Sequence, residues 1–527
     1  MRVFLAVFFC ISITLAPVRA DDRHDEGGDP AVAERYVIWV EEAIAAGQWA
    51  QARAALQRAS DFSNVSSDIS YLLALAMFQG NEGRGRVLAA LEEAIATGLW
   101  TNYSEAQARF FQAELLVAMR HYFSALDALA VREALIGDDA DSAVLRLAAL
   151  KGLVLGGAWQ APPDDPLPDN GLPVNMQLPG PAEFRQRMLE TMDRYPRDTR
   201  PLRLFFHYIR WQEPTADDSA LMELALRRLP FLLESDPELA WMAAPFILDV
   251  EEARRLVAAY RSGSLLHAAG DFSPSPASIA PALNLGLLED IDAVDELFIN
   301  DILDKGLVVS IGSLLRSEEG RDHLARNLHS FTGVVSDDED RDGIMESRAL
   351  FRQGALLEYH YDINQDGLVD MSVWFDSGVP WRAELPGLPE TGGAARASIQ
   401  WERYPLVQNV VLGDETFLFA PGGFAFSPIR FEELCATETY SGLFFPQLDP
   451  LNPGISRRML SSAAVFVQRP SAEFAGGIEH IHLDRGIPLR AEVILDGITV
   501  SVTLFENGIP VSRRIGFDGR LETIDSD

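Results

Sequence analysis

Cysteine and lysine are both scarce in this chain of 527 residues. The two cysteines, Cys10 and Cys435, allow one disulfide at most. The fold must therefore be held together by its core or by bound metal rather than by a disulfide framework. Lys151 and Lys305 are the only lysines, and arginine supplies the other basic residues. Codon bias explains this skew more simply than adaptation to a salty or alkaline medium.

The chain also lacks the short motifs that mark common enzyme classes. It contains no G-x-S-x-G, no H-E-x-x-H, no phosphate-binding glycine loop and no dinucleotide fingerprint. Cys435 has no candidate base close to it in sequence, which favours a buried structural thiol over a nucleophile. The carboxylates are too numerous to single out an acid/base pair. These absences favour a protein that is not an enzyme.

Long hydrophobic runs are missing beyond the first residues. The apolar run over residues 3–15 follows Arg2, and Pro17-Val18-Arg19-Ala20 comes after it. This pattern predicts a secretory signal peptide over residues 1–20, cleaved after Ala20, and hence a periplasmic or extracellular protein. An uncleaved anchor is disfavoured because a membrane span needs about 20 apolar residues. Cleavage would remove Cys10 and leave a single thiol.

Acidic residues dominate the charged ones. Asp and Glu number 78 against 44 Lys and Arg, which gives a formal net charge of −34. Nucleic acids and anionic membranes are therefore poor partners. Hydrophobic residues make up 48% of the chain, enough for a sizeable core. At about 150 residues a domain, the length predicts two to four domains.

The first half has helical periodicity. Ala, Leu, Glu and Arg recur at helical spacing from about residue 31 to about residue 324. A Pro-rich stretch over residues 157–181 interrupts it and predicts a linker. We therefore expect helical repeats over residues 21–156 and a further helical region over residues 182–330. The predicted helices include 32–46, 49–60, 69–79, 86–97, 105–120, 123–135, 183–194, 201–211, 218–233, 237–248 and 251–261.

A repeat recurs within residues 30–136. Each copy places small or apolar anchors one helical turn apart, and the first anchors are 35 and 38 residues apart in sequence. The pattern resembles the tetratricopeptide repeat, which implies helix–turn–helix units and a concave face for a protein or peptide partner. A generic helical bundle is the alternative, since the first helix of each unit matches poorly. The anchors are Ala52, Leu56 and Ala59, then Val87, Leu91 and Ala94, then Ala125 and Leu129.

In the second half, residues 331–527, apolar and polar residues alternate with a period of two. Two segments align without a gap, each with an acidic loop, a strand, a glycine turn (Gly354 and Gly378) and a returning strand. Similar turns at Gly486 and Gly508 indicate further hairpins. The stretch over residues 397–431 is strand-like and rich in aromatic residues. The fold class is therefore α+β, with a helical repeat region followed by an antiparallel β-meander.

The two acidic loops carry the clearest chemical signal. Both have the form D-x-[DN]-x-D-G-x-x-[ED], which places hard oxygen atoms at alternate positions of a tight turn. Ca²⁺ takes six to eight such ligands. Loop one (338–346) and loop two (362–370) are therefore predicted calcium sites. The predicted ligands are Asp338, Asp340, Asp342, the Ile344 carbonyl and Glu346 in loop one, and Asp362, Asn364, Asp366, the Leu368 carbonyl and Asp370 in loop two.

These loops resemble the short EF-hand-like calcium loops of extracellular repeat proteins. A true EF-hand has glutamate at loop position twelve. Ala349 and Val373 occupy that position here, so the acid at position nine must close the shell. The resemblance implies a structural Ca²⁺ ion that braces hairpins without disulfides. A pair of solvated acidic turns is the alternative.

One further pair of side chains suggests a metal. His480 and His482 lie on one face of a predicted strand and could form half of a zinc site. No third ligand is evident, so an outward polar face is the simpler interpretation. The sequence as a whole favours an exported, non-enzymatic scaffold that binds a protein partner. An envelope or extracellular enzyme acting on glycans, with its site in the β half, and a purely structural envelope component are the alternatives.

Overall fold

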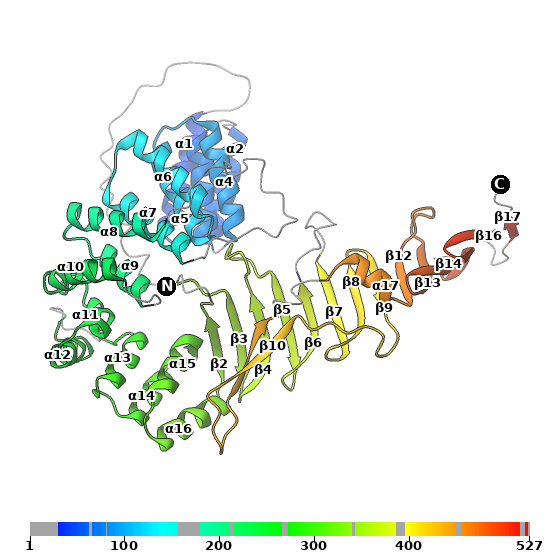
Figure 1. Cartoon of the computed structure of the whole chain (residues 1–527). Helices are drawn as coiled ribbons and strands as arrows, with labels where there is room; N and C mark the ends of the chain where they lie inside the picture. The colour runs from blue at the N-terminus through cyan, green and yellow to red at the C-terminus, as the bar shows by residue number, and fades with distance from the viewer. Residues whose placement is uncertain are drawn as a thin grey trace. The chain divides into compact units, whose positions relative to one another are not determined.

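The structure is a computed structural model that describes residues 30–62, 66–80, 82–155, 180–210, 215–265, 272–339, 343–385, 396–449, 455–516 and 522–524. Helices occupy the first part of the chain and strands the second, which confirms the predicted α+β class (Figure 1). The chain divides into two compact units, Met1–Gly80 with Ala89–Ser104, and Asn81–Leu88 with Glu105–Asp527. The predicted signal peptide and nearly all of the predicted linker lie outside the described residues.

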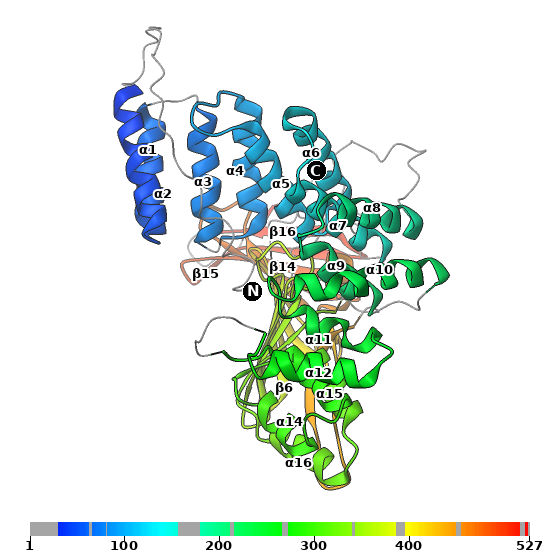
Figure 2. The same ribbon diagram turned by 90° about the vertical axis from the view of Figure 1, so that its left-hand side faces the viewer.

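The first helices follow the predicted repeat. Their bounds agree with the predicted ones to within two residues, and consecutive helices α1 and α2 pack side by side (Figure 2). Glycines with positive φ, Gly47 (70°) and Gly98 (68°), end the turns after the first and fourth helices. The helices are α1 (Pro30–Ala45), α2 (Trp49–Phe62), α3 (Ser67–Gln79), α4 (Arg84–Thr97), α5 (Glu105–Ala118) and α6 (Tyr122–Ile136).

The repeat anchors form the buried sides of α2, α4 and α6. Each of these helices turns a small residue and a larger apolar residue inward at the predicted offsets. Small side chains let neighbouring helices approach closely, and the leucines fill the remaining space. All eight predicted anchors are at most 1% exposed: Ala52, Leu56, Ala59, Val87, Leu91, Ala94, Ala125 and Leu129.

The remaining helices belong to the second compact unit. A core of Phe184, Phe205 and Tyr208 with neighbouring leucines and methionines joins several of them. They are α7 (Ala140–Val154), α8 (Pro181–Arg194), α9 (Arg200–Ile209), α10 (Ala216–Leu232), α11 (Leu239–Ala243), η1 (Ala244–Phe246), α12 (Val250–Arg261), η2 (Pro276–Ser278), α13 (Ile279–Asn284), α14 (Asp290–Leu297), α15 (Lys305–Leu314), α16 (Glu318–His329) and α17 (Arg457–Ala463). None of the helices within the described ranges is long and apolar enough to cross a membrane.

A buried carboxylic acid lies on α5. Burial raises the pKa of Glu114 to about 7, and the nearby charge of Asp141 adds to this effect while Arg132 opposes it. The folded protein therefore holds this proton at pH values where the unfolded chain, with an ordinary pKa of 4.5, releases it. The stability contributed by Glu114 is full below pH 4.5 and is lost as the pH rises through about 7.

Glu114→Gln is expected to stabilise the protein at alkaline pH. The variant removes a charge that the folded state disfavours, so we expect a gain of about 2 kcal/mol at pH 8 and little change at pH 4.5. Urea unfolding at both pH values measures the difference. Glu92→Gln, at an exposed position of α4, is the matched control. Equal effects of Glu114→Gln at the two pH values would contradict the prediction.

Fifteen strands of the described residues form one sheet, and two others form a separate hairpin. The sheet order is β1 to β9 followed by β12 to β17, so nearly every strand lies beside its sequence neighbour. All pairings are antiparallel except β1–β2, which is parallel. The early strands are β1 (Ile302–Asp304), β2 (Gly333–Asp337), β3 (Ser347–Arg352), β4 (Ala355–Tyr361), β5 (Met371–Asp376), β6 (Val379–Leu385), β7 (Ala397–Arg403), β8 (Leu406–Leu412) and β9 (Glu415–Leu418).

The later strands continue the same meander. β10 and β11 leave the main sheet and pair only with each other. The later strands are β10 (Ile429–Leu434), β11 (Leu443–Leu448), β12 (Phe466–Pro470), β13 (Ile478–Asp484), β14 (Ile487–Leu495), β15 (Ile498–Glu506), β16 (Ile509–Ile515) and β17 (Glu522–Ile524). The parallel edge strand β1 lies within a segment predicted to be helical, and that part of the prediction was wrong.

The predicted hairpin turns are present. In the β3–β4 turn, Gln353 and Gly354 both have positive φ values, 51° and 73°. Two successive positive φ values define the type I′ turn, whose twist matches that of the flanking strands. The turns centred on Ser377-Gly378, Arg485-Gly486, Asp496-Gly497 and Asn507-Gly508 have the same backbone signs.

One core joins the first part of the sheet to the helices before it. It includes Leu297 of α14, Ile311 of α15, Val373 of β5 and Trp401 of β7, all at most 5% exposed. The predicted aromatic segment over residues 397–431 contributes to this core. Strands β13 to β16 are different, because most of their side chains are exposed or half-buried on both faces.

Candidate metal centre

Loop two (362–370) is fully described and connects β4 to β5. The Asp362 carboxylate accepts hydrogen bonds from the backbone N–H groups of Asp366 (3.1 Å) and Gly367 (2.9 Å). The Asp370 carboxylate reaches back to accept one from Ile363 N at 2.8 Å. Gly367 has a φ of 85°, which permits the sharp bend. The first and last acids of the predicted motif therefore close the loop from both ends.

Loop one (338–346) repeats the same hydrogen bonds. Gly343 N donates to Asp338 Oδ2 at 2.9 Å, and Glu339 N donates to Glu346 Oε2 at 2.7 Å. These are the bonds that loop two makes from the corresponding positions. Two segments of different sequence thus share these two hydrogen bonds, which is expected of a shared motif. Asp340 and Asp342, two of the predicted ligands, lie outside the described residues.

Like charges accumulate in loop two. The pKa of Asp362 is raised to about 6, chiefly by burial and also by the neighbouring carboxylates of Asp366 and Asp370, against the Gly367 hydrogen bond. Burial also raises the pKa of Asp370, with Asp366 adding to the effect. Ionised acids held this close are unfavourable without a cation. The Arg84 guanidinium of α4 supplies some positive charge, since it donates a hydrogen bond to the Gln365 carbonyl, while the backbone N–H of Arg84 donates to the Asp366 carbonyl.

The two loops meet at Glu346. Its carboxylate, 3% exposed, accepts a hydrogen bond from the side-chain amide of Gln365, which belongs to loop two. Its backbone carbonyl accepts one from Asp362 N at 2.8 Å. Gln365 is fully buried, and within the described part of the chain its side-chain Oε1 has no hydrogen-bond partner. The motif by itself did not single out Gln365, although its position between two predicted ligands was visible.

The donor set of loop two fits a hard cation in its chemistry, since carboxylates, an amide and a backbone carbonyl are the ligands that Ca²⁺ takes. The carboxylates are engaged with backbone N–H groups of their own loop. Over the described part of the chain, no three His, Cys, Asp or Glu side chains lie close enough together to hold an ion. Calcium binding would therefore require the acids of loop two to converge further than they do in this structure.

The predicted histidine pair lies on β13. The rings of His480 and His482 both pack edge-on against Phe466 of β12, with ring centroids 5.1 Å apart in each case. Glu492 and Arg490 lie opposite them on β14. These aromatic contacts account for the two rings without a metal ion.

The thiol of Cys435 is half-buried. Burial raises the pKa of Cys435, against the smaller opposing effect of Arg321. A raised pKa keeps the group as the thiol, the less reactive form. This agrees with a structural role for Cys435.

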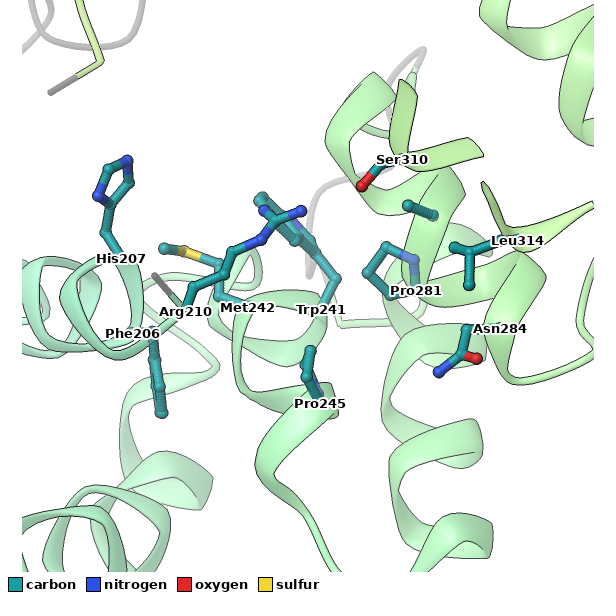
Figure 3. A pocket seen from close by; sticks show the side chains of 11 residues that line it. Phe206, His207, Arg210, Trp241, Met242, Pro245, Pro281, Asn284, Ser310 and Leu314 are labelled. Carbon is teal, nitrogen blue, oxygen red and sulfur yellow. The ribbon is translucent and has the colours of Figure 1, made fainter. Parts of the chain in front are cut away.

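A shallow groove lies among the helices of the second unit (Figure 3). It has a volume of about 180 Å³ and draws its walls from α9, α11, η1, α13 and α15. Most of its lining is apolar, and the polar side chains of Arg210 and Asn284 lie on opposite sides of it in Figure 3. The lining residues are Phe206, His207, Arg210, Trp241, Met242, Pro245, Ala280, Pro281, Asn284, Ser310 and Leu314.

The histidine at one end of this groove is uncharged at neutral pH. Burial lowers the pKa of His207 to about 3, and the positive charges of Lys151 and Arg210 lower it further. The Lys151 ammonium nitrogen lies 3.4 Å from His207 Nδ1. Burial in turn lowers the pKa of Arg210, and the nearby carboxylate of Asp304 opposes this effect by raising it. Sequence reasoning missed the groove because its walls come from helices far apart in the chain.

Comparisons with known proteins identify a relative but no family. No known protein-family model matches the chain. An uncharacterized protein from Treponema pallidum (strain Nichols) is 23% identical to it over 595 residues, an alignment that covers 92% of this chain and 70% of the relative.

The similar solved structures are tetratricopeptide-repeat and related helical proteins. A tetratricopeptide repeat protein from Parabacteroides merdae ATCC 43184 is 10% identical, with a TM-score of 0.36, over 56% of this chain and 98% of its own. MamA from Desulfovibrio magneticus RS-1 is 17% identical, with a TM-score of 0.28, over 39% and 95%. PilF from Pseudomonas aeruginosa is 12% identical, with a TM-score of 0.27, over 55% and 95%.

Proposed function

We propose that this protein is an exported, non-enzymatic scaffold of the cell envelope. Its helical region binds a protein or peptide partner, and its sheet domain is braced by calcium. The observation that carries the proposal is the repeated burial of small and apolar anchors in α2, α4 and α6. Stacked repeats of this kind form a concave surface on which a partner can bind.

The groove on the second unit is the candidate contact surface for the partner. Its apolar walls suit a hydrophobic segment, and Arg210 beside them suits an acidic side chain of that segment. Met242, in the wall, is half-buried and packs against the core around Phe205, so a thermal melt must show that a variant at this position is folded. An interface of this kind depends on a few well-packed side chains.

The calcium part of the proposal rests on the two loops. Matching hydrogen bonds hold the first and last acids of each loop, Asp338 and Glu346 in loop one and Asp362 and Asp370 in loop two. If the predicted signal peptide exports the chain, the loops meet a medium in which free Ca²⁺ is plentiful. Weak sites would then be filled, and the hairpins that follow each loop would gain the rigidity that the missing disulfides cannot provide.

Met242→Glu is expected to weaken partner binding about tenfold or more, because it places a charge in an apolar wall. The wild-type chain is used to retain a partner from an envelope extract, and the retained protein is purified for direct affinity measurement. Leu248→Glu is the matched control, since Leu248 is 98% exposed and does not line the groove. Equal affinity of the two variants would place the contact elsewhere. Failure of the wild-type chain to retain any partner, with or without a chelator, would contradict the scaffold function.

A further inference from the structure

The two acidic loops contact each other through Gln365, and this contact bears on how they would bind ions. Gln365 lies in loop two, yet its side chain points to Glu346, the acid that closes loop one. It is fully buried, and its Oε1 has no hydrogen-bond partner among the residues that the structure describes. A buried carbonyl oxygen without a partner is unfavourable. Since side-chain amide oxygens are ordinary ligands of Ca²⁺, a cation beside Glu346 would supply the missing partner.

Loop one lacks one of the ligands of a true EF-hand. Its sequence has Ala349 in place of the glutamate that completes a true EF-hand shell. A ligand from outside the loop would compensate for this loss. Because the Gln365 amide contacts the Glu346 carboxylate directly, its oxygen lies within reach of an ion that Glu346 binds.

We propose that Gln365 of loop two contributes its side-chain oxygen to a divalent cation bound by Glu346, so that the two loops fill cooperatively. This inference rests on the proposed calcium binding. Asn364 and Asp366, the neighbours of Gln365, are predicted ligands of loop two, so an ion there would fix the backbone that carries Gln365. The Gln365 side chain would then already be fixed when the second ion binds, so that ion would lose less free energy to ordering it. Linkage requires the coupling to act equally in the reverse direction.

The loop backbone supports this coupling. Gln365 has a φ of 54°, a left-handed conformation that most side chains disfavour, and the Asn364 side chain accepts a hydrogen bond from Asp366 N at 3.0 Å. The backbone link from Asp362 N to the Glu346 carbonyl, at 2.8 Å, forms a second connection between the loops. A rearrangement of one loop around an ion would therefore act on the other through these two hydrogen bonds.

The test is a calorimetric Ca²⁺ titration of the full chain and its Gln365 variants. Wild type is expected to bind two ions cooperatively. Gln365→Met keeps the size of the side chain but removes the oxygen, so we expect one site to weaken about tenfold and cooperativity to disappear. Gln365→Glu keeps an oxygen ligand and should retain or tighten binding, whereas a glutamine that served only as an N–H donor would lose affinity on this change.

Gln353→Met is the matched control. Gln353 is an exposed glutamine with a similar φ of 51°, in the turn of the β3–β4 hairpin, and its replacement should leave the titration unchanged. Melting in EGTA verifies that each variant is folded; if Gln365→Met does not fold, Gln365→Glu decides the question. Two ions bound by Gln365→Met as in wild type would overturn the coupling alone. A wild-type chain that binds no Ca²⁺ would instead overturn the proposed calcium function.

Discussion

Replacing Lys305 by methionine is expected to lower the free energy of unfolding by about 3 kcal/mol, because the change leaves a half-enclosed acid without its partner. Lys305 begins α15 and is 9% exposed. Its ammonium group lies 2.9 Å from both Asp337 of β2 and Glu432 of β10. It also lies 5.1 Å from the centre of the Phe445 ring of β11. One side chain thus joins a helix, the main sheet and the separate hairpin.

The charge of Lys305 is secure over the working pH range. Burial alone would lower its pKa, but the hydrogen bonds and charges of Asp337 and Glu432 outweigh burial and raise it. A raised pKa means that this stabilisation is fully present below the ordinary value of 10.5 and is lost only as the pH rises above it.

Urea unfolding at neutral pH measures the effect of Lys305→Met. Arg227→Met is the control, because Arg227 and its partner Glu223 are 69% and 72% exposed, and exposed pairs contribute less than about 1 kcal/mol. Lys305→Arg, which keeps the charge, should recover part of the loss. Equal stability of Lys305→Met and wild type would show that the three elements are held together without this cation.

Calcium is expected to have the largest effect on stability. With free Ca²⁺ at 100 times the dissociation constant, each site would stabilise the folded state by about 2.7 kcal/mol, or roughly 5 kcal/mol for two sites. At roughly 2–4 °C for each kcal/mol in a domain of this size, the melting temperature should fall by about 10 °C or more when EGTA is added. A thermal melt followed by circular dichroism measures the shift.

A double variant, Asp338→Asn with Asp362→Asn, provides the control for the calcium experiment. Each asparagine keeps one oxygen acceptor for the loop backbone but removes a charge from the predicted ligand set. The variant should melt close to wild type in EGTA, because the raised pKa of Asp362 indicates that its charge is unfavourable in the fold. It should gain little from Ca²⁺. An equal midpoint for wild type with Ca²⁺ and with EGTA would exclude calcium as a brace.

Periodicity was sufficient to predict most of the elements. The helices that carry the repeat anchors follow from small residues such as Ala52 and Ala125 at helical spacing, since such residues are useful only where another helix approaches. The hairpins follow from turns such as Gln353-Gly354, because glycine readily adopts the positive φ that a tight antiparallel turn requires. Both signals are local, because each lies within a short stretch of the sequence.

The elements that sequence reasoning missed depend on distant partners. β1 has three residues within a helical segment, and it is a strand because β2 offers it a parallel edge about 30 residues later. The groove combines Phe206 with Leu314, which no local pattern connects. The separation of β10 and β11 from the main sheet is likewise decided by packing, since the folded chain determines which strand edges meet.

The sequence alone determined four features: the scarcity of cysteine and lysine, the acidic balance, the repeat anchors and the two acidic loops. Composition and local spacing are properties of the chain itself. The tertiary structure decided where the scarce residues act. It buried Lys305 between two carboxylates and placed Gln365 against Glu346. Contacts between residues far apart in sequence exist only once the chain has folded, so no local pattern could have predicted them.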